Sequence, residues 1–148
     1  MSTIEFFEPL RSVLQSKIPD CKDLLNLERL SGGASMETYR ITIDSDVGER
    51  YLCLRRGSGG VNRETPSAVG LDTEAVLMKV ARAQGVSEPE VFYVLTANDG
   101  IGVGFIMEWL EGETLGARIA RAPELSAIRN NLAFQCGQEL AKIHAIDT

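Results

Sequence analysis

Apolar side chains at Tyr39, Ile41 and Ile43 alternate with polar side chains at the positions between them. This period of two predicts a β-strand with one buried face. Four further segments have strand character, namely residues 24–30, 51–56, 91–95 and 103–107. Turn-forming residues at 45–49 and 97–100 connect neighbouring segments. The pattern predicts a three-stranded meander followed by a second hairpin.

Three other segments carry apolar residues at spacings of three and four, which is typical of amphipathic helices. They are residues 4–18, 71–84 and 125–146, and a short helix is predicted from Thr114 to Arg121. The apolar stripe of the last helix consists of Leu125, Ile128, Leu132, Cys136, Leu140 and Ile143. In so small a domain, this stripe predicts a partner surface that the chain does not contain, and self-association through residues 125–146 is one way to cover it.

We therefore expect an α+β fold with a five-stranded antiparallel sheet, a flanking helix after the third strand and a long C-terminal helix. With 148 residues, of which 44% are hydrophobic, the chain has the size of one globular domain or of part of a larger one.

The charge pattern limits the classes of partner. The net charge is −6 and Lys and Arg form no long runs, which argues against nucleic-acid binding. The N-terminus has no basic region ahead of an apolar core, and no apolar run approaches membrane-spanning length. We expect a cytoplasmic protein with no membrane or nucleic-acid partner.

Cys21, Cys53 and Cys136 are odd in number and widely spaced, which predicts reduced thiols rather than disulfides or zinc ligands. A single histidine excludes a His-rich metal site.

Gly32 and Gly33 lie between the first two predicted strands. Glycine adopts positive φ readily, and successive N–H groups in such a turn can form a nest for phosphate oxygens. A Walker A loop is excluded because no Gly-Lys-Ser/Thr follows, and a dinucleotide fingerprint is excluded because a strand comes next. Ordinary hairpin turns also contain glycine pairs, so this segment alone leaves a phosphate loop and a simple turn both open.

Glu74 falls near the centre of the apolar face predicted for the helix 71–84, which comprises Leu71, Leu77, Met78 and Ala81. An unpaired buried carboxylate would cost several kcal/mol. Either a cation meets Glu74, with Arg55 and Arg56 on the preceding strand as candidates, or the helix packs loosely and Glu74 is exposed.

Taken in order, several motifs resemble the aminoglycoside phosphotransferase family of small-molecule kinases, whose N-terminal lobe has the protein-kinase-like fold. The motifs are Gly32-Gly33-Ala34-Ser35 with Thr38-Tyr39, Leu54-Arg55-Arg56, Phe105 to Gly112, and Leu140-Ala141 with Ile143-His144-Ala145. The Leu-Arg-Arg form resembles the branch related to kinase domains attached to acyl-CoA dehydrogenase-like proteins.

The helical pattern predicts an N-terminal packing helix in residues 1–22. The resemblance, which covers the chain from about Leu24 onward, implies a nucleotide-binding lobe with its hinge in residues 23–112 and the start of a C-terminal lobe in residues 113–148. It also implies ATP or GTP as the nucleotide, Mg²⁺ as the metal and a small hydroxyl-bearing acceptor.

The implied phosphate contacts lie at the glycine turn and on the third strand. Backbone N–H groups of Ser31, Gly32, Gly33, Ala34 and Ser35 would cover the phosphates. Arg55 would replace the usual strand lysine, contact the α- and β-phosphates and pair with Glu74. Arg56 is the alternative, although alternation turns it to the other face of the sheet.

The implied adenine pocket has Cys53 in its roof and Met107 at its back. The carbonyl of Glu108 and the N–H of Leu110 would bind the adenine edge, while Trp109 would pack in the connector. Met36 departs from the family pattern, because relatives often have asparagine there and a thioether cannot replace the hydrogen bonds of an amide.

A larger departure concerns catalysis. The family's His-Gly-Asp segment with an Asn five residues after the Asp, and its later metal-binding Asp, do not occur in the 148 residues, and the spacing of His144 and Asp147 does not match. We expect no catalytic residue and no metal ligand in this chain, which would not turn over alone. A non-catalytic nucleotide- or partner-binding module and a truncated product are the alternatives, and the acceptor is open.

Overall fold

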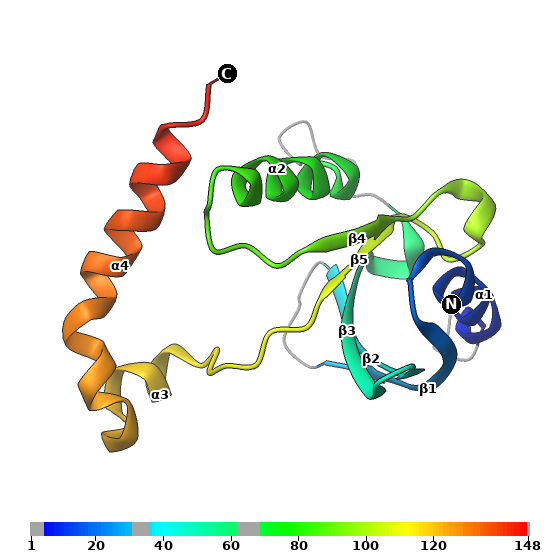
Figure 1. Cartoon of the computed structure of the whole chain (residues 1–148), viewed down its shortest axis with the longest axis horizontal. Coiled ribbons are helices and arrows are strands. Elements are labelled where there is room, and N and C mark those ends of the chain that lie inside the picture. The colour runs from blue at the N-terminus through cyan, green and yellow to red at the C-terminus, as the bar shows by residue number, and fades with distance from the viewer. Residues whose placement is uncertain (1–4, 31–35, 62–68, 148) are drawn as a thin grey trace.

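The computed structural model of the chain describes residues 5–30, 36–61 and 69–147 (Figure 1). Its centre is a five-stranded antiparallel sheet with the strand order β1-β2-β3-β5-β4. The strands are β1 (Cys21–Arg29), β2 (Met36–Ser45), β3 (Gly48–Gly57), β4 (Val91–Val94) and β5 (Gly104–Glu108). The predicted meander and second hairpin are confirmed.

The hairpin of β2 and β3 forms the centre of the sheet. Its register runs without a bulge from Ser45 opposite Gly48 to Met36 opposite Gly57. Gly48 has a φ of +102°, which glycine adopts without strain, and the Ser45 hydroxyl donates to the Gly48 carbonyl at 2.6 Å. The tight turn fixes the register, so neighbouring residues on β3 face opposite sides of the sheet.

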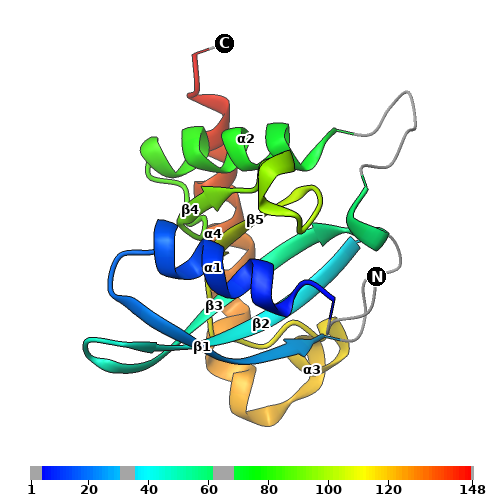
Figure 2. The same cartoon turned by 90° about the vertical axis from the view of Figure 1, so that its right-hand side faces the viewer.

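Helix α1 (Phe7–Lys17) covers one face of the sheet. In Figure 2, α1 lies in front of the strands and the C-terminal helix lies behind them. The main core forms between α1 and the sheet, and its fully buried members include Phe6, Leu10, Leu14, Tyr39, Ile41, Ile43 and Leu54. The predicted alternation on the second strand is confirmed, because Tyr39, Ile41 and Ile43 all point into this core.

Helix α2 (Leu71–Ala83) packs on β4 and β5 through a smaller cluster of Leu71, Ala75, Val91 and Phe105. The predicted apolar face of this helix is partly wrong, since Leu77 is 56% exposed. Ala75 lies one helical turn after Leu71 and takes the inward position. Leu77 is turned away from the sheet by the helical period and borders a groove with Ile143 and Ile146.

After β5 the chain leaves the sheet and enters α3 (Gly116–Arg121) and α4 (Ser126–His144). Figure 1 shows α4 standing at the side of the sheet opposite α1. No residue of α4 is buried, and Ile128, Phe134, Leu140 and Ile143 are exposed apolar side chains. Ser87, between α2 and β4, donates from its N–H and its hydroxyl to the Glu139 carboxylate of α4 at 2.9 and 3.1 Å.

Three short 3₁₀ segments, η1 (Ser58–Gly60), η2 (Ala97–Asp99) and η3 (Pro123–Leu125), complete the described elements. Within the described ranges, none of the helices is long and apolar enough to cross a membrane.

The different burial of two leucines on α2 predicts different effects on stability. Leu71→Ala removes a fully buried side chain and should lower the free energy of unfolding by about 2–5 kcal/mol. Leu77→Ala makes the same chemical change at an exposed site and should cost less than about 1 kcal/mol. Urea denaturation followed by circular dichroism measures both, and equal losses would contradict the described orientation of α2.

Candidate functional site

A cavity of about 250 Å³ lies where the end of β1, the middle of β3 and the chain after β5 meet. It is lined by Leu30, Cys53, Pro89, Met107, Glu108, Trp109, Leu110 and Thr114. Four of these, Cys53, Met107, Glu108 and Leu110, are residues that the sequence assigned to an adenine pocket. The structure therefore brings together residues from two distant segments at one cavity, although their binding role stays a prediction.

Sheet register places Cys53 directly opposite Met107 in the neighbouring strand. The Cys53 side chain is buried, and burial raises the pKa of its thiol to about 11, against a smaller lowering by the charge of Arg55. At neutral pH the thiol is therefore protonated and behaves as a small apolar group. Together with the Met107 thioether it gives the cavity an apolar wall that suits a flat aromatic ring.

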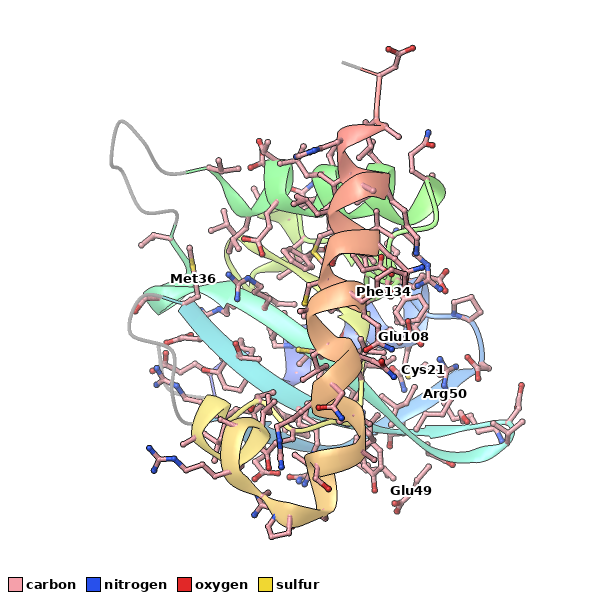
Figure 3. The ribbon with its side chains drawn as sticks, turned by 90° about the vertical axis from the view of Figure 1, so that its left-hand side faces the viewer. Cys21, Met36, Glu49, Arg50, Glu108 and Phe134 are labelled. Atoms are coloured by element: carbon pink, nitrogen blue, oxygen red, sulfur yellow. The ribbon has the colours of Figure 1, made fainter. Side chains whose placement is uncertain are left out.

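The connector after β5 supplies the polar edge of the cavity. Among the described residues, the backbone N–H of Leu110 donates to no protein acceptor. The Glu108 carboxylate accepts the N–H of Glu90 at 3.1 Å and lies 3.7 Å from Arg82 at the end of α2. Figure 3 shows Glu108 at the side of the sheet that faces α4. The Glu108 side chain therefore anchors the start of the connector. The backbone N–H of Leu110 stays available for a contact with a ligand.

Trp109 contacts Glu111 of the connector and also lines the cavity, so its predicted packing role in place of stacking on a base stays a prediction. Its indole N–H donates to Glu111 at 2.6 Å, and the Arg40 guanidinium lies 5.8 Å from the ring centre. Arg40 in turn binds Glu28 on β1 at 2.6 Å. These contacts join the connector to β2 and, through Glu28, to β1.

Arg55 and Glu74 form the predicted ion pair between β3 and α2. Arg55 Nε lies 2.8 Å from Glu74 Oε1, while the contact with hydrogen-bond geometry joins Nη2 and Oε2 at 3.4 Å. Both side chains are about one-third exposed (34% and 32%), so Glu74 is paired but is not buried within an apolar stripe. Arg55 shares its sheet face with Cys53, two positions earlier on β3, and its exposed donors can meet a further anion.

Arg56 faces the opposite side of the sheet and is fully buried. It donates to Glu37 Oε2 at 2.6 Å and to the Ile101 carbonyl at 2.7 Å, and its guanidinium lies 4.4 Å from the centre of the Phe6 ring. Burial raises the pKa of Glu37, but the bonds from Arg56 and from the Gly59 N–H bring that pKa below its usual value. Arg56 is thus committed to the core. Arg55 lies on the cavity face, which it shares with Arg40, the register partner of Cys53.

Ser31, Gly32, Gly33, Ala34 and Ser35, which were assigned to the phosphates, lie outside the described residues. Met36, the departure from the family pattern, is the first residue of β2 and packs against the cluster of Leu71, Ala75, Val91 and Phe105. An apolar thioether at this position is therefore explained by its contact with the α2 cluster.

Sequence reasoning missed Leu30, Pro89 and Thr114 as lining residues of the cavity. Pro89 and Thr114 lie in loops, where the sequence has no helix or strand period. The sequence alone therefore could not show that they line the cavity. Glu37 was also missed, although a signal existed. It shares the period-two face of Tyr39, Ile41 and Ile43, where a carboxylate needs a buried partner.

Larger grooves occur beside α4. One of about 750 Å³ is lined by Ser87 and by residues of α4, and another of about 280 Å³ lies between α2 and the end of α4. Neither is lined by Cys53 or Met107, so the predicted site residues gather at a smaller cavity than the groove beside α4. In the described part of the chain, no group of three or more His, Cys, Asp or Glu side chains could hold a metal ion.

Comparison with known proteins agrees with this geometry. The model of the APH phosphotransferase enzyme family matches residues 26–148, which is most of the chain. The chain therefore belongs to this family, and its five-stranded sheet with α2 is the kinase-like N-terminal lobe of the family. A search of curated proteins found no match. The family match does not test the acyl-CoA dehydrogenase-related branch, which stays a prediction.

The environments of the cysteines predict their order of reaction. At pH 8, about 0.1% of Cys53 is thiolate if its pKa is about 11, and the side chain is buried. Cys136 is exposed, so iodoacetamide should label it at least about tenfold faster than Cys53. Mass spectrometry of the labelled peptides measures both rates, with urea-unfolded protein as the control in which the difference disappears. Equal labelling of the folded chain would show that Cys53 is accessible.

Proposed function

We propose that this chain is the nucleotide-binding lobe of a small-molecule phosphotransferase that transfers the γ-phosphate of ATP to a substrate hydroxyl. The observation that carries the proposal is the Arg55–Glu74 ion pair, which lies on the same sheet face as the Cys53 cavity in a chain of this family. A cavity alone would suit many ligands. A cavity with a strand-borne cation beside it suits a ring joined to phosphates.

The base of the nucleotide would lie between Cys53 and Met107. A cavity of about 250 Å³ is smaller than typical pockets for drug-sized ligands, which agrees with a site for the base only. The N–H of Leu110 and the carbonyl of Glu108 would bind the edge of the base. These are backbone groups, so adenine and guanine both remain open as the base.

The phosphates would lie toward Arg55 and the segment Ser31 to Ser35. Glu74 neutralises part of the Arg55 charge and orients the guanidinium on the sheet face that also carries Cys53, while the remaining donors would bind phosphate oxygens. Arginine presents a planar fork where kinases of this fold usually have a lysine, so two parallel bonds to one phosphate are favoured over a point contact.

ATP supplies the phosphoryl group, and transfer depends on positioning and on neutralising charge around it. The described residues offer no metal cluster, so no step through Mg²⁺ is assigned to them. The sequence also contains no His-Gly-Asp segment. The proposal therefore gives this chain nucleotide binding, and assigns none of its residues as catalytic base, metal ligand or acceptor contact.

Calorimetric titration of ADP and MgATP into the purified chain tests the proposal. We expect binding, and we expect Glu74→Ala to weaken it by about three- to tenfold, because Arg55 loses the carboxylate that orients it. Arg55→Ala should weaken binding by at least about tenfold, since a hydrogen bond to a charged group contributes about 1.5–3 kcal/mol.

Glu49→Ala is the matched control, because it removes an exposed carboxylate at the far end of the hairpin (Figure 3). Its affinity should equal that of the unchanged protein. A folded chain that binds neither nucleotide, or an Arg55→Ala variant that binds normally, would contradict the proposal.

A second candidate function is docking or self-association through α4, favoured by the observation that none of its residues is buried. Leu140 and Ile143 of the predicted stripe are exposed, and so is Phe134 on the other side of the helix, which Figure 3 labels. Exposed apolar side chains along one helix are typical of an interaction surface.

Sedimentation velocity distinguishes this candidate. If α4 mediates self-association through the predicted stripe, the chain should sediment as a dimer or larger species at about 50 µM. Leu140→Asp should return it to a monomer, because a buried charge opposes apolar contact. Val47→Asp, at an exposed turn position away from α4, is the control and should have no effect. A monomeric chain at this concentration would argue against self-association.

A further inference from the structure

The buried pair of Glu37 and Arg56 lies at the end of the sheet that carries the Arg55–Glu74 site. Register places Glu37 opposite Arg56 and Thr38 opposite Arg55. Arg55 and Arg56 are neighbours on one strand and point to opposite faces. Any movement of the Arg56 backbone therefore moves Arg55.

Glu37 gathers contacts from several elements of the sheet. Its Oε2 accepts the Arg56 guanidinium at 2.6 Å and the Tyr39 hydroxyl at 3.2 Å. Its Oε1 accepts the Gly59 N–H at 3.4 Å and lies 3.5 Å from Arg29 Nη2 near the end of β1. One carboxylate thus joins β1, β2, β3 and η1.

The surrounding backbone is fitted to Arg56. Gly60 has a φ of +81°, and a Cβ there would lie 2.7 Å from Arg56 Nη2. The guanidinium also donates to the Ile101 carbonyl, before β5, and lies against the Phe6 ring next to α1. These contacts leave the Arg56 side chain one position to occupy.

Stability alone is a weak reason for such a pair. Replacing buried ion pairs with apolar side chains is often neutral or stabilising, because taking two charges out of water offsets their attraction. Apolar side chains cannot replace the directional hydrogen bonds that Glu37 and Arg56 make. Such bonds fix the positions of the strand ends more closely than apolar packing does.

We propose that Glu37 and Arg56 are positioning residues for the nucleotide phosphates. They hold the ends of β1, β2 and β3 in register, and so set where Arg55 meets a phosphate. Neither touches the nucleotide. The inference rests on the proposed function, and it predicts an effect that depends on phosphate and is absent for the base alone.

The test compares adenosine, ADP and MgATP binding by calorimetry in the unchanged chain and in Glu37→Gln. The variant removes the negative charge of the pair and keeps a side chain of nearly the same size. We expect ADP and MgATP to bind about tenfold more weakly, and adenosine affinity to change by less than about twofold.

The matched control is Asp20→Asn. Asp20 pairs with Arg50, also on β3, at 2.7 Å, and Figure 3 shows Arg50 and Met36 towards opposite ends of the hairpin. Asparagine tolerates the positive φ of Asp20. This variant loses a partly exposed ion pair of the same strand away from the site, and all three affinities should be unchanged.

Glu37→Gln can fail to fold, since replacing one partner of a buried ion pair is strongly destabilising. In that case Tyr39→Phe tests the positioning role of Glu37, because it removes the hydroxyl that donates to Glu37 and keeps the ring. We expect about a two- to threefold loss of ADP affinity with adenosine affinity unchanged.

Equal weakening of adenosine and ADP would assign the pair a purely structural role and overturn the inference, as would unchanged ADP binding by the folded variant. If the unchanged chain binds no nucleotide, the proposed function fails and the inference fails with it. The titration of the unchanged chain separates these two failures.

Discussion

Alternation along β3 is the constraint on which the rest of this structure depends. Two consecutive arginines must face opposite sides of the sheet. Arg56 enters the core between the sheet and α1, where burial forces it to have a counterion, and Glu37 supplies it at 2.6 Å. Arg55 faces the cavity side, where it meets Glu74. The core and the candidate site are therefore linked through adjacent residues of one strand.

The two ion pairs differ in what surrounds them. The Glu37–Arg56 pair is almost fully removed from water and has additional partners, so its geometry is fixed by several contacts. The Arg55–Glu74 pair is about one-third exposed and has looser hydrogen-bond geometry. An anion site is favoured by this combination, in which the buried Glu37–Arg56 pair fixes the strand and the partly exposed Arg55–Glu74 pair can adjust. A bound anion can then accept hydrogen bonds from the Arg55 donors that Glu74 does not use.

Much of the fold follows from the sequence because its elements have strong periods. The β2 alternation, the tight turn before Gly48 and the amphipathic pattern of α1 each indicate the correct structure. The α2 face was harder to predict. Leu77 was expected inside because it is large and apolar, but the small Ala75 occupies the inward position. The apolar pattern of α2 allows either a face with Leu77 or a face with Ala75 to pack on the sheet, and the local sequence does not distinguish them.

The site could be predicted only in part for the same reason. Cys53, Arg55 and Met107 lie on strands, so alternation and register determine their neighbours. Pro89 and Thr114 reach the cavity through irregular segments whose path no period describes. Glu37 could have been found by applying to β2 the reasoning that identified Glu74, since a carboxylate on an apolar face requires a partner wherever it occurs.

The central claim is that nucleotide binds between the sheet and the connector. Hydrogen–deuterium exchange of the chain with and without saturating ADP tests it most directly, because exchange reports which backbone amides a ligand covers. The account predicts slower exchange at residues 107–110, on either side of Cys53 and Arg55 on β3, and no change in α4. Protection confined to α4 and the segment around Ser87, or no protection by a ligand shown to be bound, would contradict it.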